Sequence, residues 1–403
     1  MLRSAAGVVA TRVVRAAATR ASKLPRPVVV GGVAATVWFV VVAAMPGGGD
    51  APGGGPAGKT GDRFVKDNLS ALNRSNVFRV YLDPIGSDAN DGVVPQRPVR
   101  SLARAQQVIA AARPKADVEV RIRQGIYVAP PVKWSTYIPG HTITFLPVDY
   151  EFGEGQTGIS GRPVFRGDGS TGFWLKAQPK TGHQGDTRLS FYFLQVEGYS
   201  TGGLTFDGGT AVDQQQMLRP GSPGVNGNTV YGMVFRGLGS KYVRSGVGYG
   251  AIDLVNSRNN VIQNNRFTSL ENAGSPAEMG LIHGVYLSHH SSGNLIKENR
   301  FYNISGDPIR TRNSSSDNKI YDNTFDRTGS NAYFSDWFTS GVRGGRAGEC
   351  ASTGNSFYNN DLISGYRRQI SVWWITPEAQ AQPGGGCGAA GAQRVHVWGN
   401  QIS

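Results

Sequence analysis

One pattern recurs through the C-terminal half of this chain and constrains its fold more than any other feature. An asparagine is followed five residues later by a second asparagine, and an apolar residue stands two positions after each of them. Strict alternation over so few residues is typical of a β-strand and not of a helix. The pattern occurs in NVIQNNRF, NLIKENRF, NKIYDNTF and NSFYNNDL, which begin at residues 260, 294, 318 and 355, and more loosely in RVHVWGNQI at 394–402.

The spacing of the pattern indicates a stack of coils. The second asparagine recurs in steps of 34, 24, 37 and 40 residues, so the shortest step is a bare coil and the longer steps carry insertions. A single repeat of this kind cannot bury its apolar face and depends on its neighbours. We therefore predict an all-β fold, a single-stranded right-handed parallel β-helix or solenoid. We expect the asparagines to form amide ladders at the turns. We also expect one internal aromatic ladder from Phe206, Phe235, Phe267, Phe301 and Phe325.

The region before the repeats reads as the covered end of such a stack. Residues 78–84 and 118–127 have strand patterns, 86–92 is a polar turn, and 101–112 is a short helix with Ser101 as its N-cap. A helix at this place would cover the open end of the first coil, which would otherwise expose core side chains and an unpaired strand edge. We predict a β-helix domain over 77–403, with an N-terminal cap formed by 77–127.

The N-terminus is predicted to direct export. Six basic residues come within the first 27 positions, followed by 18 uncharged residues from Val28 to Met45 and a Gly- and Pro-rich stretch. This order marks 1–45 as a signal peptide, and its length also allows a transmembrane signal anchor; 46–76 would be a tether. Both readings place the remaining chain outside the cell, secreted or anchored, with membrane contact only through this segment. In an exported protein, Cys350 and Cys387 are expected to form one disulfide bond.

Charge favours an acidic partner over most others. Beyond the basic leader, 35 basic residues stand against 28 acidic ones, a net charge of +7, which suits a uronic-acid polysaccharide. The basic residues are dispersed and no recognition motif appears, so we predict no nucleic-acid partner. We expect a monomer. The turn formed by Asp88, Asn90, Asp91 and Gly92 resembles the start of a calcium loop without its distal glutamate. Ca²⁺ is therefore the one cofactor considered, and no metal ligands are assigned.

A candidate site follows from the strand that precedes each asparagine turn. If alternate residues of these strands point inward, the residues between them gather on one outer face, because neighbouring coils lie about 4.8 Å apart. Four ionisable residue types converge there, which is more typical of a site than of a solvated strand. The candidate catalytic residues are His283, Tyr286, Asp307, Arg310 and Arg312. The candidate substrate-binding residues are Asp253, His289, Tyr333, Asp336, Trp337 and Trp373.

This set of residues could carry out β-elimination on a uronate chain. Arg310 or Arg312 would neutralise the sugar carboxylate, a base among Tyr286, His283 and His289 would take the C5 proton, and Asp307 or Asp336 would orient the histidine or bind a cation. One alternative is glycoside hydrolysis, with Asp253, Asp307 or Asp336 as acid and base. Another is a non-catalytic polysaccharide-binding or surface-display module, in which aromatic side chains stack on sugars.

The strand, GSDANDG turn and short helix at 78–112, followed by coils with NxIxxNxF, resemble the pectate lyase-like right-handed parallel β-helix superfamily over roughly 77–403. The resemblance implies the β-helix fold and a carbohydrate-active protein, most often an extracellular polysaccharide lyase, glycoside hydrolase or epimerase. The chain departs from named subfamilies: it lacks the paired aspartates and Gly-His-Gly of polygalacturonase-type hydrolases and the Asp-Pro-His signature of mannuronan epimerases. It also lacks a full set of pectate lyase calcium ligands.

Overall fold

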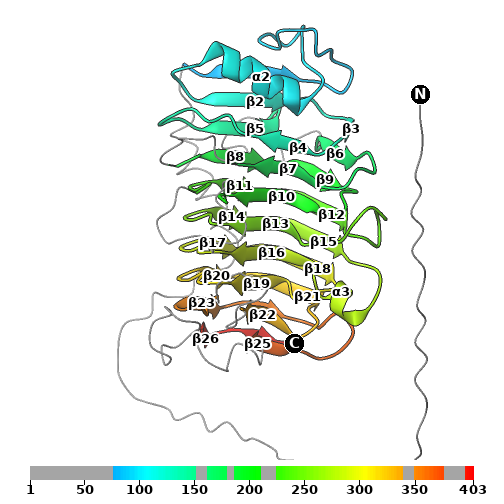
Figure 1. The fold of residues 1–403 in the computed structure, drawn as a ribbon, viewed down its shortest axis with the longest axis vertical. Coiled ribbons are helices and arrows are strands. Elements are labelled where there is room, and N and C mark those ends of the chain that lie inside the picture. Colours follow the sequence, from blue (N-terminus) through cyan, green and yellow to red (C-terminus); the bar gives the residue numbers. More distant parts are fainter. Residues whose placement is uncertain (1–75, 151–160, 179–185, 210–223, 339–348, 376–394) are drawn as a thin grey trace, which may run out of the picture. The chain divides into compact units, whose positions relative to one another are not determined.

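The computed structural model describes residues 76–150, 161–178, 186–209, 224–338, 349–375 and 395–403. These residues form a parallel β-helix, in which each complete coil contributes one strand to each of three sheets (Figure 1). Every strand pair in the three sheets is parallel, as the repeat predicts, and successive coils wind in the right-handed sense that parallel crossovers adopt. The predicted fold is confirmed.

Sheet A holds the strands that begin at the first asparagine of the repeat, sheet B those after the second asparagine, and sheet C those that return to the next coil. Sheet A consists of β1 (Phe78–Leu82), β2 (Val118–Ile122), β5 (Ile143–Pro147), β8 (Leu189–Tyr192), β11 (Thr229–Tyr231), β14 (Val261–Gln263), β17 (Leu295–Lys297), β20 (Lys319–Tyr321), β23 (Asn355–Tyr358) and β26 (Val395–Trp398). Sheet B consists of β3 (Ile126–Ala129), β6 (Val164–Gly167), β9 (Gln195–Glu197), β12 (Val234–Leu238), β15 (Arg266–Leu270), β18 (Arg300–Ile304), β21 (Thr324–Thr328), β24 (Asp361–Leu362) and β27 (Gln401–Ile402). Sheet C consists of β4 (Val132–Trp134), β7 (Phe173–Ala177), β10 (Gly202–Asp207), β13 (Gly250–Val255), β16 (His283–Ser288), β19 (Ile309–Arg312), β22 (Ala332–Trp337) and β25 (Ser371–Ile375).

The turn from sheet A to sheet B has two residues in each repeat. The first residue has a left-handed backbone, with φ near +55° at Asn264, Glu298 and Asp322. The second is the buried asparagine of a ladder: the Asn265 side-chain amide donates to Asn299 Oδ1 at 3.0 Å, and Asn299 donates to Asn323 Oδ1 at 3.0 Å. These amides therefore satisfy one another and the turn's buried backbone groups, as predicted.

A second amide ladder runs before the strands of sheet A. It links Asn228, Asn260, Asn294, Asn318 and Asn355 through side-chain bonds of 2.7 to 3.0 Å. Both asparagines of the motif are therefore structural, which explains why their five-residue spacing is kept while the intervening letters change.

The core contains a stack of nearly parallel phenylalanine rings in sheet B. Ring centroids are 5.4 Å apart between Phe235 and Phe267, 4.6 Å between Phe267 and Phe301, and 4.8 Å between Phe301 and Phe325. Phe206 does not continue this stack, contrary to the prediction. Phe206 lies in β10 of sheet C, where it pairs with Leu254. The prediction failed because β10 has the same apolar alternation as the sheet B strands but occupies a different place in the coil.

Helix α2 (Leu102–Ala112) lies at the N-terminal end of the stack beside β1 (Figure 1). Ser101 is its N-cap, since its side chain accepts a hydrogen bond from the Arg104 backbone N–H at 3.1 Å. Leu102, Ala105 and Ile109 are buried in the common core. The short α3 (Pro276–Met279) lies in the connection that leads to β16.

The predicted leader, anchor and tether lie outside the described residues, as does Cys387, so the export segment and the disulfide bond stay predictions. Among the described residues, no helix has the length and apolar character to cross a bilayer. In the turn considered for calcium, Asp88 Oδ1 accepts the backbone N–H groups of Arg100 and Ser101 at 2.8 and 2.9 Å.

Candidate active site on the outer face of sheet C

The outer face of sheet C brings several predicted residues into one column. Asp253 of β13 is the register partner of Tyr286 in β16, and Tyr286 is the partner of Arg310 in β19. Ser335 of β22 continues the column below Arg310. Because neighbouring strands lie about 4.8 Å apart, these side chains are adjacent although the chain separates them by whole coils. The predicted convergence of Asp253, Tyr286 and Arg310 is confirmed.

Arg312 lies beside this column and contacts Tyr286. Its Nη1 is 3.4 Å from the Tyr286 hydroxyl. Its Nε donates to both carboxylate oxygens of the fully buried Glu349 at 2.9 Å, and its guanidinium lies 4.3 Å from the centre of the Trp337 ring. Glu349 and Trp337 thus hold Arg312 in place. Arg312 is suited to position the Tyr286 hydroxyl, and not to bind a substrate carboxylate through two hydrogen bonds.

Sequence reasoning missed Glu349. It lies in the insertion between β22 and β23, where no periodic pattern assigns it to a face. The only available signal was an acidic residue next to Cys350 in a chain with few acids.

Arg310 is held by the buried carboxylate of Asp307. Arg310 Nη2 is 2.8 Å from Asp307 Oδ2, and its Nε donates to Ser335 Oγ at 3.0 Å. Asp307 also accepts backbone N–H groups of Ser330 and Asn331 at 3.0 and 2.8 Å. Burial raises the pKa of Asp307, but Arg310 and the backbone donors outweigh it, so the pKa lies below its ordinary value and the carboxylate stays charged. Among the described residues, Arg310 Nη1 makes no hydrogen bond to the protein and is available to a ligand.

His283 supports this pair from inside. Its Nδ1 is 2.7 Å from the Asp307 carbonyl oxygen, and since a carbonyl can only accept, Nδ1 must carry the proton. The imidazole ring lies 5.2 Å from the Tyr286 ring, centroid to centroid. His283 is only 2 % exposed and Asp307 is fully buried. His283 is therefore not placed to act as the base on a substrate, and Asp307 is not placed to act as the acid or base of hydrolysis. Asp307 instead holds Arg310, and His283 packs against Tyr286.

The buried histidine should make stability depend on pH. Burial, followed by the charge of Arg310, lowers the pKa of His283 to about 3, whereas an unfolded histidine has a pKa of about 6.5. Because the folded state binds the proton less tightly, the stabilising contribution is complete above about pH 6.5 and is lost as the pH falls from there toward 3. We expect the Tm of the wild type to fall between about pH 6.5 and 4, and His283→Asn to reduce that fall.

Circular dichroism melts over this pH range check the prediction, with His396→Asn, an exposed histidine on β26, as the matched control. If the His283 and His396 variants follow the wild-type curve equally, the linkage is wrong.

Two predicted residues point into the core rather than outward. The register of β19 with β22 pairs Ile309 with Phe334, two residues beyond the expected Ala332. This register aligns two large apolar side chains inside. Asp336 is therefore paired with the buried Thr311 instead of following the inward pair, and it accepts a hydrogen bond from Thr311 Oγ1 at 2.9 Å and is 1 % exposed. Tyr333 is 5 % exposed and packs near Phe325, so it cannot stack on a sugar as predicted.

The remaining predicted binding residues lie at the edges of the face. His289 follows β16 in a left-handed conformation, and its Nδ1 is 3.0 Å from Asn313 Nδ2 on the next coil. Trp337 covers Arg312. Trp373 lies on β25 and is 43 % exposed, but its register partner is the core residue Phe334, so it does not continue the column. Of these three residues, Trp337 is the one whose ring borders the column beside Arg312.

Asp253 lies at the upper end of the column. It is 6 % exposed, and its buried Oδ1 has no hydrogen-bond partner. Burial raises the pKa of Asp253 well above its ordinary value, the charge of Asp207 adds to the rise, and Lys176 opposes it. Asp207 itself is paired with Lys176 at 2.6 Å. Burial thus disfavours the ionised form of Asp253, and the neighbouring Asp207 is a carboxyl group that the sequence pattern does not single out.

No family model and no curated protein matches this chain. Among solved structures it is similar to an alginate lyase from Paenibacillus (TM-score 0.42, 11% identity, covering 82% of this chain and 100% of the other). It is also similar to a rhamnogalacturonan lyase (TM-score 0.34, 12% identity, 81% and 86% covered) and a pectate lyase (TM-score 0.31, 10% identity, 79% of each). At these values the likeness is one of fold alone.

Proposed function

We propose that this protein is a polysaccharide lyase that cleaves an acidic, uronate-containing glycan by β-elimination. The observation that carries the proposal is the Tyr286 hydroxyl on an outer sheet face, 3.4 Å from Arg312 Nη1 and next in register to Arg310. A phenol between two arginines is suited to hold negative charge. The export segment predicted at 1–45 fits a glycan substrate outside the cell.

Each accessible group has a role in the reaction. Arg310 would neutralise the uronate carboxylate through its Nη1, which makes the C5 proton more acidic. Tyr286, as the phenolate, would take that proton. The electron pair then forms the C4–C5 double bond while the C4–O bond breaks, and the proton passes from Tyr286 to the leaving oxygen. Asp307 and His283 hold Arg310 and Tyr286 in place, and Trp337 would border the sugar.

The pH dependence of cleavage should report on Tyr286. Burial raises its pKa above the ordinary value, whereas Arg312 and Arg310 lower it. The phenolate is therefore a minor species at neutral pH, and cleavage should accelerate with rising pH, up to about tenfold per unit. The double substitution Arg312→Gln with Glu349→Gln removes the positive charge nearest to the Tyr286 hydroxyl. It also removes the buried carboxylate that would otherwise lose its partner. We expect this double variant to move the alkaline rise to higher pH.

Rate against pH for wild type and double variant measures the shift. Arg97→Gln with Asp91→Asn, an exposed ion pair 3.0 Å apart near the N-terminal end, is the control. A profile unchanged by loss of the Arg312–Glu349 pair would remove Arg312 from the mechanism.

The product decides the reaction type. Pectate, alginate, chondroitin and heparan incubated with the full chain should yield unsaturated, ultraviolet-absorbing ends from at least one glycan. Reducing ends without ultraviolet absorbance would mean hydrolysis. If no acidic glycan gives either product, the protein is a binding module and not a lyase or hydrolase.

Hydrolysis is the second candidate, because Asp253 and Asp207 lie close enough for Asp207 to raise the pKa of Asp253. Two carboxyl groups on the same face are what a glycosidase uses as acid and base. The predicted alternatives for that role, Asp307 and Asp336, are buried and committed to protein contacts.

A further inference from the structure

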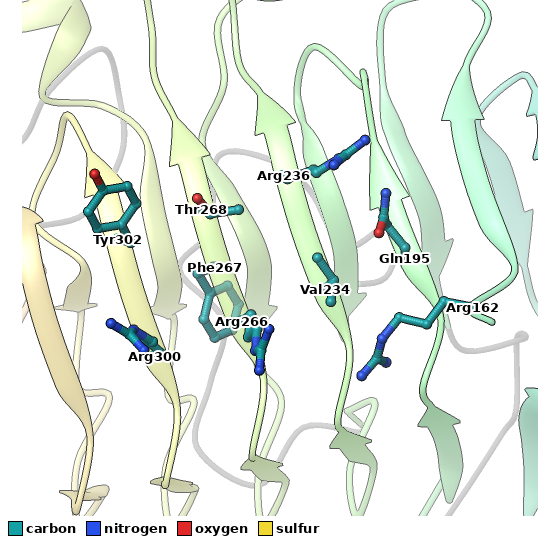
Figure 2. Close-up of a pocket in the computed structure, with 9 residues that line it drawn as sticks. All are labelled: Arg162, Gln195, Val234, Arg236, Arg266, Phe267, Thr268, Arg300 and Tyr302. Carbon is teal, nitrogen blue, oxygen red and sulfur yellow. The ribbon is translucent and has the colours of Figure 1, made fainter. Parts of the chain in front are cut away.

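A groove of about 580 Å³ lies over the outer face of sheet B, away from the candidate active site on sheet C. Its volume falls within the range of small-ligand sites. Figure 2 shows the side chains of Arg162, Arg266 and Arg300 in one row, with the strands of Val234 and Gln195 between Arg266 and Arg162, and Arg236, Thr268 and Tyr302 in a second row. The described residues that line the groove therefore include four arginines and no acid.

The arginine row is electrostatically costly in the free protein. Arg266 of β15 and Arg300 of β18 are register partners, and like charges directly opposite each other destabilise a sheet. In the part of the chain that the structure describes, neither side chain makes an ion pair or hydrogen bond. Arg236, by contrast, pairs with Glu197 at 2.7 Å, as does Arg166. The positive charge of Arg236 in the second row is thus neutralised by an acid, whereas the charges of Arg266 and Arg300 in the first row are not.

Arg162 extends the row. Its guanidinium lies 5.5 Å from the centre of the Phe193 ring, and its Nη1 donates to the Gly232 carbonyl. These contacts fix a third positive charge near Arg266. An anion bound along the row would relieve the repulsion among the three guanidinium groups.

The rest of the lining suits a sugar chain. Tyr302 is 38 % exposed and offers a ring for stacking, Gln195 and Thr268 offer an amide and a hydroxyl, and Val234 is apolar. Proteins that hold single-stranded nucleic acid use an aromatic side chain for successive bases. Here Tyr302 is the one exposed aromatic ring among the lining residues of the groove. Arginines therefore recur on successive coils but aromatic rings do not, which favours an acidic glycan over a single-stranded nucleic acid.

We propose that this groove is a second binding site for acidic polysaccharide, in which carboxylate groups of an extended chain lie against Arg266 and Arg300. The identity of the ligand rests on the proposed function, whereas the existence of an anion site rests on the groove alone. A glycan held on sheet B would keep the enzyme attached to its polymer between cleavage events on sheet C.

The test measures binding separately from catalysis. Arg266→Gln with Arg300→Gln is compared with Arg97→Gln with Arg100→Gln, which removes the same charge from exposed positions near the N-terminal end. All proteins carry Tyr286→Phe so that no glycan is consumed. Retardation in native gels containing polygalacturonate or alginate gives the dissociation constant. Loss of two charge-assisted contacts should weaken binding at least about tenfold, with the control variant unchanged and both melting curves like that of the parent.

Equal retardation of the two double variants would overturn the proposal. A single-stranded oligonucleotide that binds more tightly than either glycan, and loses affinity in the Arg266 and Arg300 variant, would overturn it in favour of a nucleic-acid site. If no glycan is cleaved by wild type but the selective loss of glycan binding persists, the groove stands and the lyase proposal falls.

Discussion

Tyr286→Phe is expected to reduce cleavage of the responsive glycan by about 10² to 10⁴-fold, the contribution of a positioned acid–base group. The substitution removes only the hydroxyl that would exchange a proton with C5 and the leaving oxygen. The ring and its contact with His283 remain, as does the apolar packing of β16. KM should change little, because Arg310 would still hold the substrate carboxylate.

Steady-state rates from ultraviolet absorbance measure the effect, and Tyr81→Phe on β1 is a matched control with the same chemical change in the first coil. Thermal unfolding should coincide for the two variants. A positioned acid–base group contributes at least about 10²-fold to the rate. If Tyr286→Phe keeps more than about a tenth of wild-type turnover, Tyr286 is therefore not the acid–base residue.

Asn299→Ala is expected to produce the largest loss of stability from a single side chain, about 3 to 5 kcal/mol. The Asn299 amide donates to the Ile262 carbonyl and to Asn323 Oδ1 at 2.9 and 3.0 Å, and its oxygen accepts two bonds from Asn265 at 3.0 Å. Asn299 is 2 % exposed, so water cannot replace these partners. Alanine would leave buried donors and acceptors unsatisfied on both neighbouring coils.

Urea unfolding followed by circular dichroism gives the free energy of unfolding, with the exposed Asn76→Ala as control. One ordinary hydrogen bond contributes about 1 kcal/mol to stability. A smaller loss in the free energy of unfolding would contradict the prediction and show that the neighbouring asparagines find other partners. The loss should be smaller at Asn400, whose oxygen accepts from Asn360 but which has no described coil beyond it.

The repeat predicts the fold because both of its asparagines have a single structural explanation. A buried amide at a turn must find partners, and an identical amide one coil away supplies them. The outer column of sheet C follows from the same regularity, since coils of one register place Tyr286 and Arg310 side by side.

Sequence reasoning fails where this regularity is absent. Phe206 has the same local alternation as the phenylalanines of sheet B, and alternation alone does not say to which sheet a strand belongs. The sequence pattern places Asp336 just after the inward pair of its strand, because the length of the connection before β22 leaves the register open by two residues. The pairing of Phe334 with Ile309 instead aligns Asp336 with the buried Thr311 within β22. Glu349 comes from an insertion with no pattern at all.

The groove on sheet B could have been found from the sequence. Arg266 and Arg300 occupy the same position of the repeat, immediately before Phe267 and Phe301. A charged residue that recurs at an outward position forms a continuous row once the coils stack. The signal was overlooked because the adjoining asparagines and phenylalanines account for the fold without it.

The two-residue turn between sheets A and B limits where this protein can accept new sequence. An added residue there would displace an asparagine from its ladder and shift every following side chain from the inner to the outer face. Connections that enter and leave sheet C already differ in length from coil to coil while strand pairing is preserved. Variants with altered glycan preference are therefore best sought by exchanging those connections, with the sheet A to sheet B corner left untouched.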